Sequence, residues 1–209
     1  MNKQRLFKEF EKMNLSNPLE YARELVAPLC KKQLDAMILN CNDCKTANGC
    51  QKVITEGNPN ANYLIISRAN DKDYLNELLE IAEIPKDDVF IINSISCILK
   101  KQFSNNKSIL RMPTSTEHNN CKYFVDYALK FVNPRIVISM GATSLYRKDV
   151  SLEDVRGKFI DFNGFKTICT YSPIFPDDIS DEEMDEVGNK IVEDLLKAKQ
   201  YINNLKRKV

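Results

Sequence analysis

The stretch RIVISMGATSLY, residues 135–146, decides the fold of this chain. Its first half is apolar almost throughout and rich in β-branched residues, which is typical of a strand covered on both faces. From Gly141 the pattern changes to that of a helix. The stretch therefore predicts a buried strand that runs directly into a helix, as in an α/β sheet.

Three further runs have the same composition: YLII from Tyr63, VFII from Val89 and TICT from Thr167. Segments with helical spacing of apolar residues lie between them, for example residues 73–84 and 121–132. Strands that alternate with helices predict a parallel sheet with helices on both faces. We therefore expect an α/β protein with a four-stranded parallel sheet in a three-layer α/β/α arrangement.

The last part of the chain has the clearest helix signal. Ser180 and Glu183 form the spacing of a capping box, and apolar residues then recur every three or four positions up to Leu205. Acidic residues at the start and the basic residues 206–208 at the end match the helix dipole. This predicts a long surface helix packed on the sheet.

Residues 1–40 predict two short helices, the second beginning near Pro18. Pro28 is expected to kink or end that second helix, because proline lacks the backbone N–H that a helix interior uses. We expect residues 1–37 to form a helical extension and residues 38–209 to form the α/β domain.

Composition excludes several classes of protein. With 43% hydrophobic and 28% charged residues, the 209-residue chain is neither fibrous nor largely disordered. A net charge of +1 gives no general attraction to nucleic acid, so DNA binding would depend on local basic patches. The first sixteen residues have scattered charges and no apolar core, so we expect neither a signal peptide nor a membrane span, and a cytoplasmic protein.

Seven cysteines in a reducing compartment are expected to be thiols or metal ligands. Cys41 and Cys44 form a CNDC turn, whose spacing lets both sulfur atoms reach one metal centre. From the residues alone, a zinc site, an iron–sulfur cluster, a redox dithiol and a pair of unligated thiols all stay open. Further ligands would come from Cys30, Cys50, Cys97, Cys121 and Cys169.

A series of motifs extends this pattern, in the order CNDC, EGNPNANYLIIS, DDVFIINSISC, RMPTSTEHNNC, NPRIVISMGATSLY and VRGKFIDFNGFKTICTYSPIF. From about residue 38 to 178 the chain resembles the iron–sulfur uracil-DNA glycosylases of the family 4 type. The resemblance implies the fold of those enzymes, with a 4Fe-4S cluster as cofactor. It implies cluster ligation by Cys41, Cys44, Cys97 and Cys121, and it leaves Cys30, Cys50 and Cys169 as packed thiols.

The residues that the resemblance implies for the active site are mostly changed. Asn93 matches the asparagine that reads uracil, but SRAND at residues 67–71 replaces a glycine-rich loop, with Arg68 at the position of a glutamate. The segment with the base-stacking aromatic is missing, and Ser172 replaces a histidine. The candidate catalytic residues are Asn93, Asp71 and Ser172, with Asp73 as the alternative carboxylate and Tyr74 as the alternative aromatic.

The resemblance also implies phosphate contacts near the long loop of residues 100–117. Such contacts give sequence-independent, salt-sensitive affinity for DNA. An ordinary solvated lysine loop is the alternative. The candidate DNA-binding residues are Lys100, Lys101, Lys107, Arg111 and Arg156.

Three hypotheses follow. The first is an iron–sulfur protein related to uracil-DNA glycosylases that binds DNA, single-stranded or containing uracil, or a repair or replication partner, with little or no glycosylase activity. The second is an active glycosylase that hydrolyses the N-glycosidic bond of uracil or another lesion through a rewired pocket. The third is a structural zinc protein that acts as an interaction module. A protein partner would bind the N-terminal helices.

Overall fold

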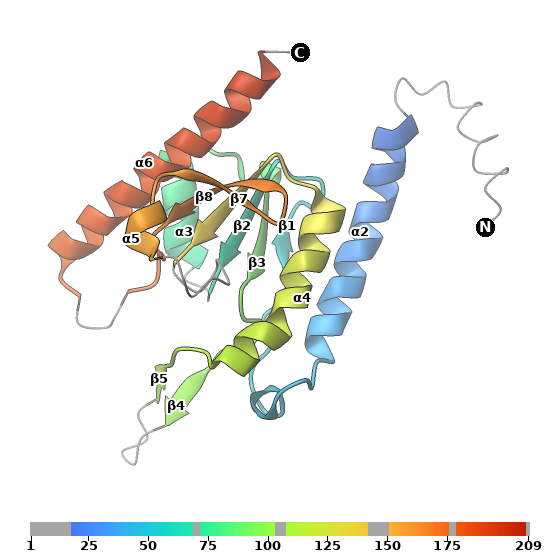
Figure 1. Ribbon diagram of the computed structural model, residues 1–209, viewed down its shortest axis with the longest axis vertical. Helices are drawn as coiled ribbons and strands as arrows, with labels where there is room; N and C mark the ends of the chain where they lie inside the picture. Colours follow the sequence, from blue (N-terminus) through green and yellow to red (C-terminus); the bar gives the residue numbers. More distant parts are fainter. Residues whose placement is uncertain (1–17, 69–71, 103–107, 142–150, 176–178, 208–209) are drawn as a thin grey trace, which may run out of the picture.

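The computed structural model describes residues 18–68, 72–102, 108–141, 151–175 and 179–207 (Figure 1). These residues form an α/β fold with a six-stranded, largely parallel sheet in the order β1-β3-β2-β6-β8-β7. The strands are β1 (Glu56–Gly57), β2 (Tyr63–Ser67), β3 (Val89–Asn93), β6 (Ile136–Met140), β7 (Phe159–Phe162) and β8 (Phe165–Thr170). The helices are α2 (Pro18–Leu39), α3 (Lys72–Ile81), α4 (Ser115–Val132), α5 (Leu152–Val155) and α6 (Asp181–Lys206), with short 3-10 turns at Lys45–Ala47 and Lys86–Asp88.

The four predicted strands form the parallel centre of the sheet, β3-β2-β6-β8. The prediction of four strands was wrong in number, because β1 and β7 add an antiparallel strand at each edge. β1 has only two residues and gives almost no pattern. β7 joins β8 through Asn163 and Gly164, both with positive φ, which is the turn that an Asn-Gly pair favours in a hairpin.

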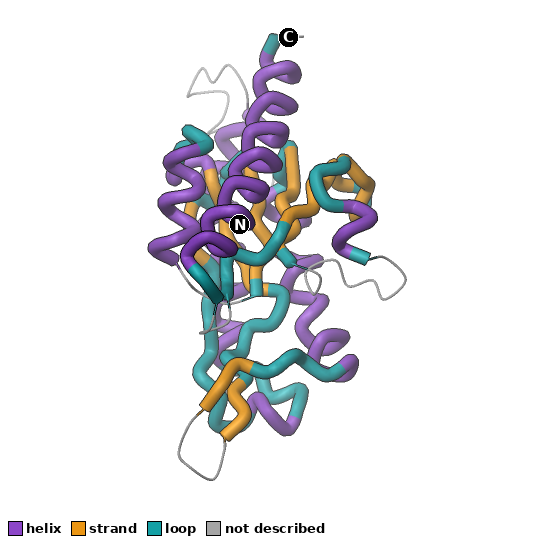
Figure 2. Tube along the Cα trace, turned by 90° about the vertical axis from the view of Figure 1, so that its left-hand side faces the viewer, coloured by secondary structure: helices purple, strands orange, loops and turns teal. Residues whose placement is uncertain are grey.

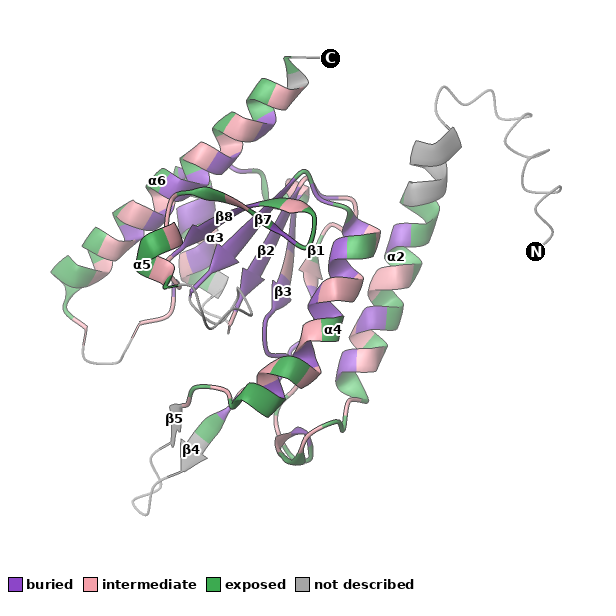
Figure 3. Cartoon of the chain, in the orientation of Figure 1, coloured by how far each residue is buried: buried purple, intermediate pink, exposed green. Residues whose placement is uncertain are grey.

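Both faces of the sheet are covered, as an apolar parallel sheet requires. Side chains alternate along β2, so that Leu64 and Ile66 pack toward α2 and α4, whereas Tyr63 and Ile65 pack toward α3 and α6. The central strands are buried almost throughout (Figure 3). The predicted capping box at Ser180 is present and begins α6, as expected.

Helix α2 runs through Pro28, so the expectation that this residue ends the helix was wrong, and the expected kink stays a prediction. Pro28 is exposed, so the carbonyl that loses its helical partner can be solvated. On the inner side, the Asp35 carboxylate accepts hydrogen bonds from the backbone and hydroxyl of Thr55, at 2.9 and 2.6 Å. These two hydrogen bonds, together with packing on α4, hold α2 against the rest of the described fold. The first expected helix lies outside the described residues.

The predicted loop at residues 100–117 contains a hairpin of β4 (Lys100–Gln102) and β5 (Ser108–Leu110). It projects from the lower end of the molecule, away from the main sheet, in two perpendicular views (Figure 1, Figure 2). The sequence does not predict β4 as a strand, because lysine is not typical of strands. None of the described helices is long and apolar enough to cross a membrane.

Candidate active site and metal centre

Two of the three candidate catalytic residues lie at the carboxyl edge of the parallel sheet, but on strands that are not neighbours. Asn93 ends β3 beside Ser67 of β2, and Ser172 follows β8 beside Gly141, where an added Cβ would lie 3.1 Å from the Ser172 Cβ. Three strand spacings separate β3 from β8, or about 14 Å. Open α/β sheets bind ligands at this edge. The third candidate, Asp71, lies outside the described residues.

Ser67 and Asn93 share one face of the sheet. They are register partners, and the alternation of side chains places both on the side of α3 and α6. Both residues are buried, and the Ser67 hydroxyl has no hydrogen-bond partner in the described part of the chain. This is the face on which Asn93 could receive a ligand.

Ser172 is half-buried, and its Oγ accepts a hydrogen bond from the backbone N–H of Ile174 at 3.3 Å. The hydroxyl proton stays available to a ligand, because the bond uses Oγ as an acceptor. The next residues lead to Phe175, which packs edge-to-face on Tyr74 at 5.6 Å between ring centroids. Tyr74, the alternative aromatic, is thus part of the packing between α3 and the segment after β8.

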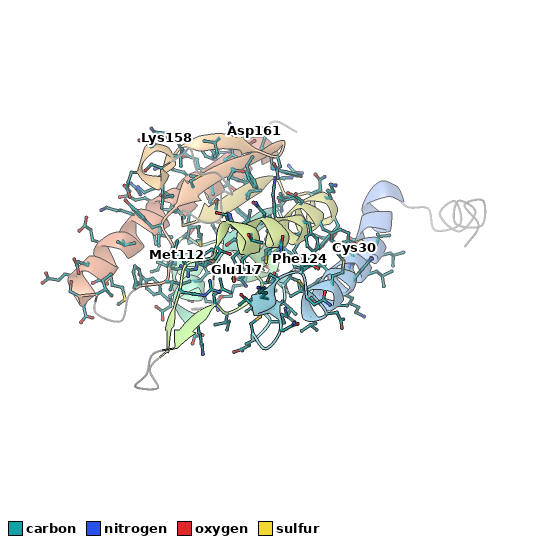
Figure 4. All side chains as sticks on the ribbon, turned by 60° about the horizontal axis from the view of Figure 1, so that its bottom comes forward. Cys30, Met112, Glu117, Phe124, Lys158 and Asp161 are labelled. Atoms are coloured by element: carbon teal, nitrogen blue, oxygen red, sulfur yellow. The ribbon has the colours of Figure 1, made fainter. Side chains whose placement is uncertain are left out.

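Arg111 connects the hairpin to the start of α4. Its guanidinium forms a two-pronged ion pair with Glu117, at 2.6 and 2.9 Å, and a longer contact of 3.4 Å with Thr46 Oγ1. The same Glu117 completes the capping box of α4 with Thr114. Figure 4 shows Glu117 close to Met112, where the hairpin meets α4. The hydrogen bond from Arg111 holds the pKa of the buried Glu117 carboxyl well below its usual range.

Arg68 lies beside this group. It directly follows β2 and donates to the backbone carbonyl of Arg111 and, at 2.9 Å, to the sulfur of Met112. Burial lowers the pKa of Arg68, and the neighbouring charge of Arg111 lowers it further. Arg68, at the carboxyl edge of the sheet, therefore contacts Arg111, at the end of the hairpin.

The four cysteines that the resemblance implies as ligands come from three distant segments and lie near one another. Burial raises the pKa of the Cys121 thiol to about 11, and Cys97, Cys41 and Cys44 are close enough to add to the rise. Cys97 and Cys121 are buried, and the other two are half-buried. The described residues nevertheless contain no three His, Cys, Asp or Glu side chains that converge on a single metal ion.

A fifth cysteine lies in the same region. Cys50, expected to be a packed thiol, shares a thiol hydrogen bond with Cys97, whose pKa burial raises to about 12. Lys52 closes this side, since its Nζ donates to the Cys41 carbonyl at 2.8 Å and to the Cys97 sulfur at 3.5 Å. Only the resemblance separates Cys50 from the four implied ligands, since residue spacing alone leaves it among the candidates.

Cys30 and Cys169 lie away from this group. Cys169 is fully buried in β8, and burial raises the pKa of its thiol to about 11. Cys30 lies on α2 next to Tyr127 of α4. Their surroundings agree with packed thiols.

Comparison with known proteins finds a relative of this chain. The chain is 33% identical over 133 residues to a type-4 uracil-DNA glycosylase of Thermotoga maritima. It is a distant homologue of that enzyme. The match covers 61% of this chain and 64% of the glycosylase, so the chain spans less than two thirds of the relative's length. No family model matches the chain.

The basic residues expected to contact DNA have different surroundings. Lys100 is exposed on β4, but the side chain of Lys101 and all of Lys107 lie outside the described part of the chain. Arg111 is engaged by Glu117, as described above.

Arg156 is also held by protein groups. It donates to the carboxylate of Asp194 at 3.0 Å and lies over the Tyr171 ring, 5.4 Å from its centroid. Asp194 is fully buried in α6 and accepts a second bond, of 2.9 Å, from Lys197. Sequence reasoning missed Asp194, because an acidic residue in an amphipathic helix usually faces water. This ion pair ties the Arg156 turn to α6.

Proposed function

We propose that this protein is an iron–sulfur relative of uracil-DNA glycosylases that binds DNA and has little or no glycosylase activity. The homology supports the DNA ligand. One observation carries the loss of activity: the chain has a single histidine, His118, in the first turn of α4. Helix α4 covers the face of the sheet opposite to Asn93, so no imidazole stands beside the candidate base pocket.

The chemistry of the lost group explains the expected effect. When the N-glycosidic bond breaks, uracil leaves as an anion, and a donor fixed at the developing charge stabilises the transition state. The Ser172 hydroxyl is a neutral donor that also takes part in a local turn with Ile174. Loss of one preorganised donor typically lowers the rate about a hundredfold or more.

We propose that the four gathered cysteines hold a polynuclear cluster rather than a single zinc ion. A structural zinc ion needs four ligands at about 2.0–2.3 Å from one centre, whereas the ligands of a cluster bind different iron atoms and stand apart. The thiols of Cys97 and Cys121 have raised pKa values, so metal binding must displace protons from them. When bound, the cluster would fix the CNDC loop to β3 and α4.

An excision assay tests this function. Anaerobically purified protein, with visible absorption that verifies a loaded cluster, is incubated with single- and double-stranded oligonucleotides that contain uracil. We expect the wild-type protein to release no more uracil than an Asn93→Ala variant does. We also expect the wild-type protein to bind the same oligonucleotides.

Cleavage clearly above that of the Asn93→Ala control would contradict the proposal and support the rewired glycosylase, in which Asn93, Ser172 and Asp71 act together. A colourless protein that contains zinc would support the third hypothesis, a structural zinc module. Metal analysis of the purified protein separates these two outcomes before any assay.

A protein partner at the N-terminal helices stays a second proposal, supported by the outer face of α2. Leu25, Val26 and Leu29 are 54%, 53% and 64% exposed, although they are apolar. Exposed apolar patches on helices are typical docking sites. We expect a Leu25→Glu, Leu29→Glu variant to fold normally and to lose any repair or replication partner in co-purification; retention of that partner would exclude this face.

A further inference from the structure

Arg68 has an incomplete set of partners. Its guanidinium has five N–H donors, of which Nη1 reaches a thioether, a weak acceptor, and Nη2 reaches a backbone carbonyl. No carboxylate in the described ranges forms an ion pair with it. A charge half removed from water normally has a counter-charge. Within the described part of the chain, the charge of Arg68 is therefore not balanced by an anion.

Arg111 is itself positive and cannot neutralise Arg68, but its backbone carbonyl holds the Arg68 guanidinium in place. Its own charge is neutralised by Glu117, so the group of two arginines and one carboxylate keeps a charge of +1. Glu117 is in turn held by Thr114 and Thr46. The carbonyl that accepts from Arg68 therefore belongs to a rigid support. A guanidinium held on one side presents its other donors in a plane that suits two phosphate oxygens.

The location favours the phosphate of a nucleic acid strand. Ser67 and its register partner Asn93 face α3 and α6, whereas Arg68, the next residue, points to the other side of the sheet, toward Arg111 and Met112. A DNA strand that crosses the carboxyl edge of the sheet with a base at Asn93 would present a backbone phosphate to Arg68. The exposed Lys100 lies on the hairpin that leads into Arg111 and adds positive charge on the same side.

We infer that Arg68 binds a backbone phosphate of a DNA strand at the carboxyl end of β2, with Arg111 and Glu117 as its support. This inference rests on the proposed function and specifies how the site recognises DNA.

Fluorescence anisotropy with a single-stranded oligonucleotide, across a series of salt concentrations, tests the inference. Arg68→Gln is expected to weaken binding about tenfold at low salt. It is also expected to reduce the slope of log K against log salt by about 0.7, the value for one lost phosphate contact on a single strand. Arg68→Lys, which keeps the charge without the planar donors, is expected to retain the slope and to lose part of the affinity.

Arg135→Gln is the matched control. Arg135 is exposed just before β6, at the amino ends of the parallel strands. Its substitution removes the same charge without a change at the carboxyl ends. Thermal melting of each variant verifies that it folds. Equal effects of Arg68→Gln and Arg135→Gln would overturn the inference while DNA binding itself stands.

Failure of the wild-type protein to bind any oligonucleotide would instead overturn the proposed function. A thermal-shift experiment with inorganic phosphate then distinguishes the source of the anion. If phosphate stabilises the wild-type protein and not Arg68→Gln, the ligand is a small phosphate-bearing molecule, and the assignment to a DNA strand is wrong.

Discussion

A Cys121→Ser variant is expected to lose the proposed iron–sulfur cluster completely. Cys121 is buried at the inner face of α4, beside the other three proposed ligands, so no neighbouring water can easily replace its sulfur. Because a bound centre links the CNDC loop, β3 and α4, its loss should also lower the melting temperature by about 10 °C. Visible absorption, iron analysis and thermal melting measure the two effects.

Two control variants make the experiment specific. Cys30→Ser removes a thiol of α2 outside the group and is expected to keep the cluster and its absorption. Cys50→Ser removes the thiol that contacts Cys97 and is expected to keep the iron content as well. A colourless Cys50→Ser protein, together with a coloured Cys121→Ser protein, would assign Cys50 as the fourth ligand instead.

Glu117→Gln is expected to lower the free energy of unfolding at neutral pH by about 3 kcal/mol. The Glu117 side chain is only 7% exposed, pairs with Arg111 and caps α4, so the amide leaves a positive charge uncompensated beside Arg68. Chemical denaturation measures the change. Glu183→Gln is the matched control, because Glu183 forms the same capping box on α6 in an exposed position with no arginine.

The pH dependence of Glu117→Gln follows from the direction of the shift. The pKa of Glu117 is lower in the folded protein than in the unfolded chain, so its stabilisation is fully present above the unfolded value of about 4.3. It is lost as the pH falls below that value toward the folded pKa. The difference in stability between wild type and Glu117→Gln should thus be constant from pH 7 to about 5 and shrink below about pH 4. A difference that stays constant in acid would exclude a carboxylate with a lowered pKa.

Several parts of the fold were predictable because they depend on local pattern. Four apolar runs predicted the parallel strands, and Ser180 with Glu183 predicted the start of α6, since both signals lie within a few residues. The edge strands were missed for opposite reasons. β1 has only two residues and is too short to give a pattern. β7, in contrast, is followed by Asn163–Gly164, a pair that predicts a hairpin with β8.

The sequence by itself determined the types of residue available at the site. It has one histidine, an arginine in place of an expected glutamate, and cysteines spaced as in iron–sulfur glycosylases. Only the tertiary structure decided their partners. Glu117 with Thr46, Arg156 with Asp194 and Cys97 with Cys50 are pairs formed between segments that the fold brings together. Local periodicity reports which face of an element is buried, but it carries no information about which charge lies opposite, and that depends on the packing of the whole chain.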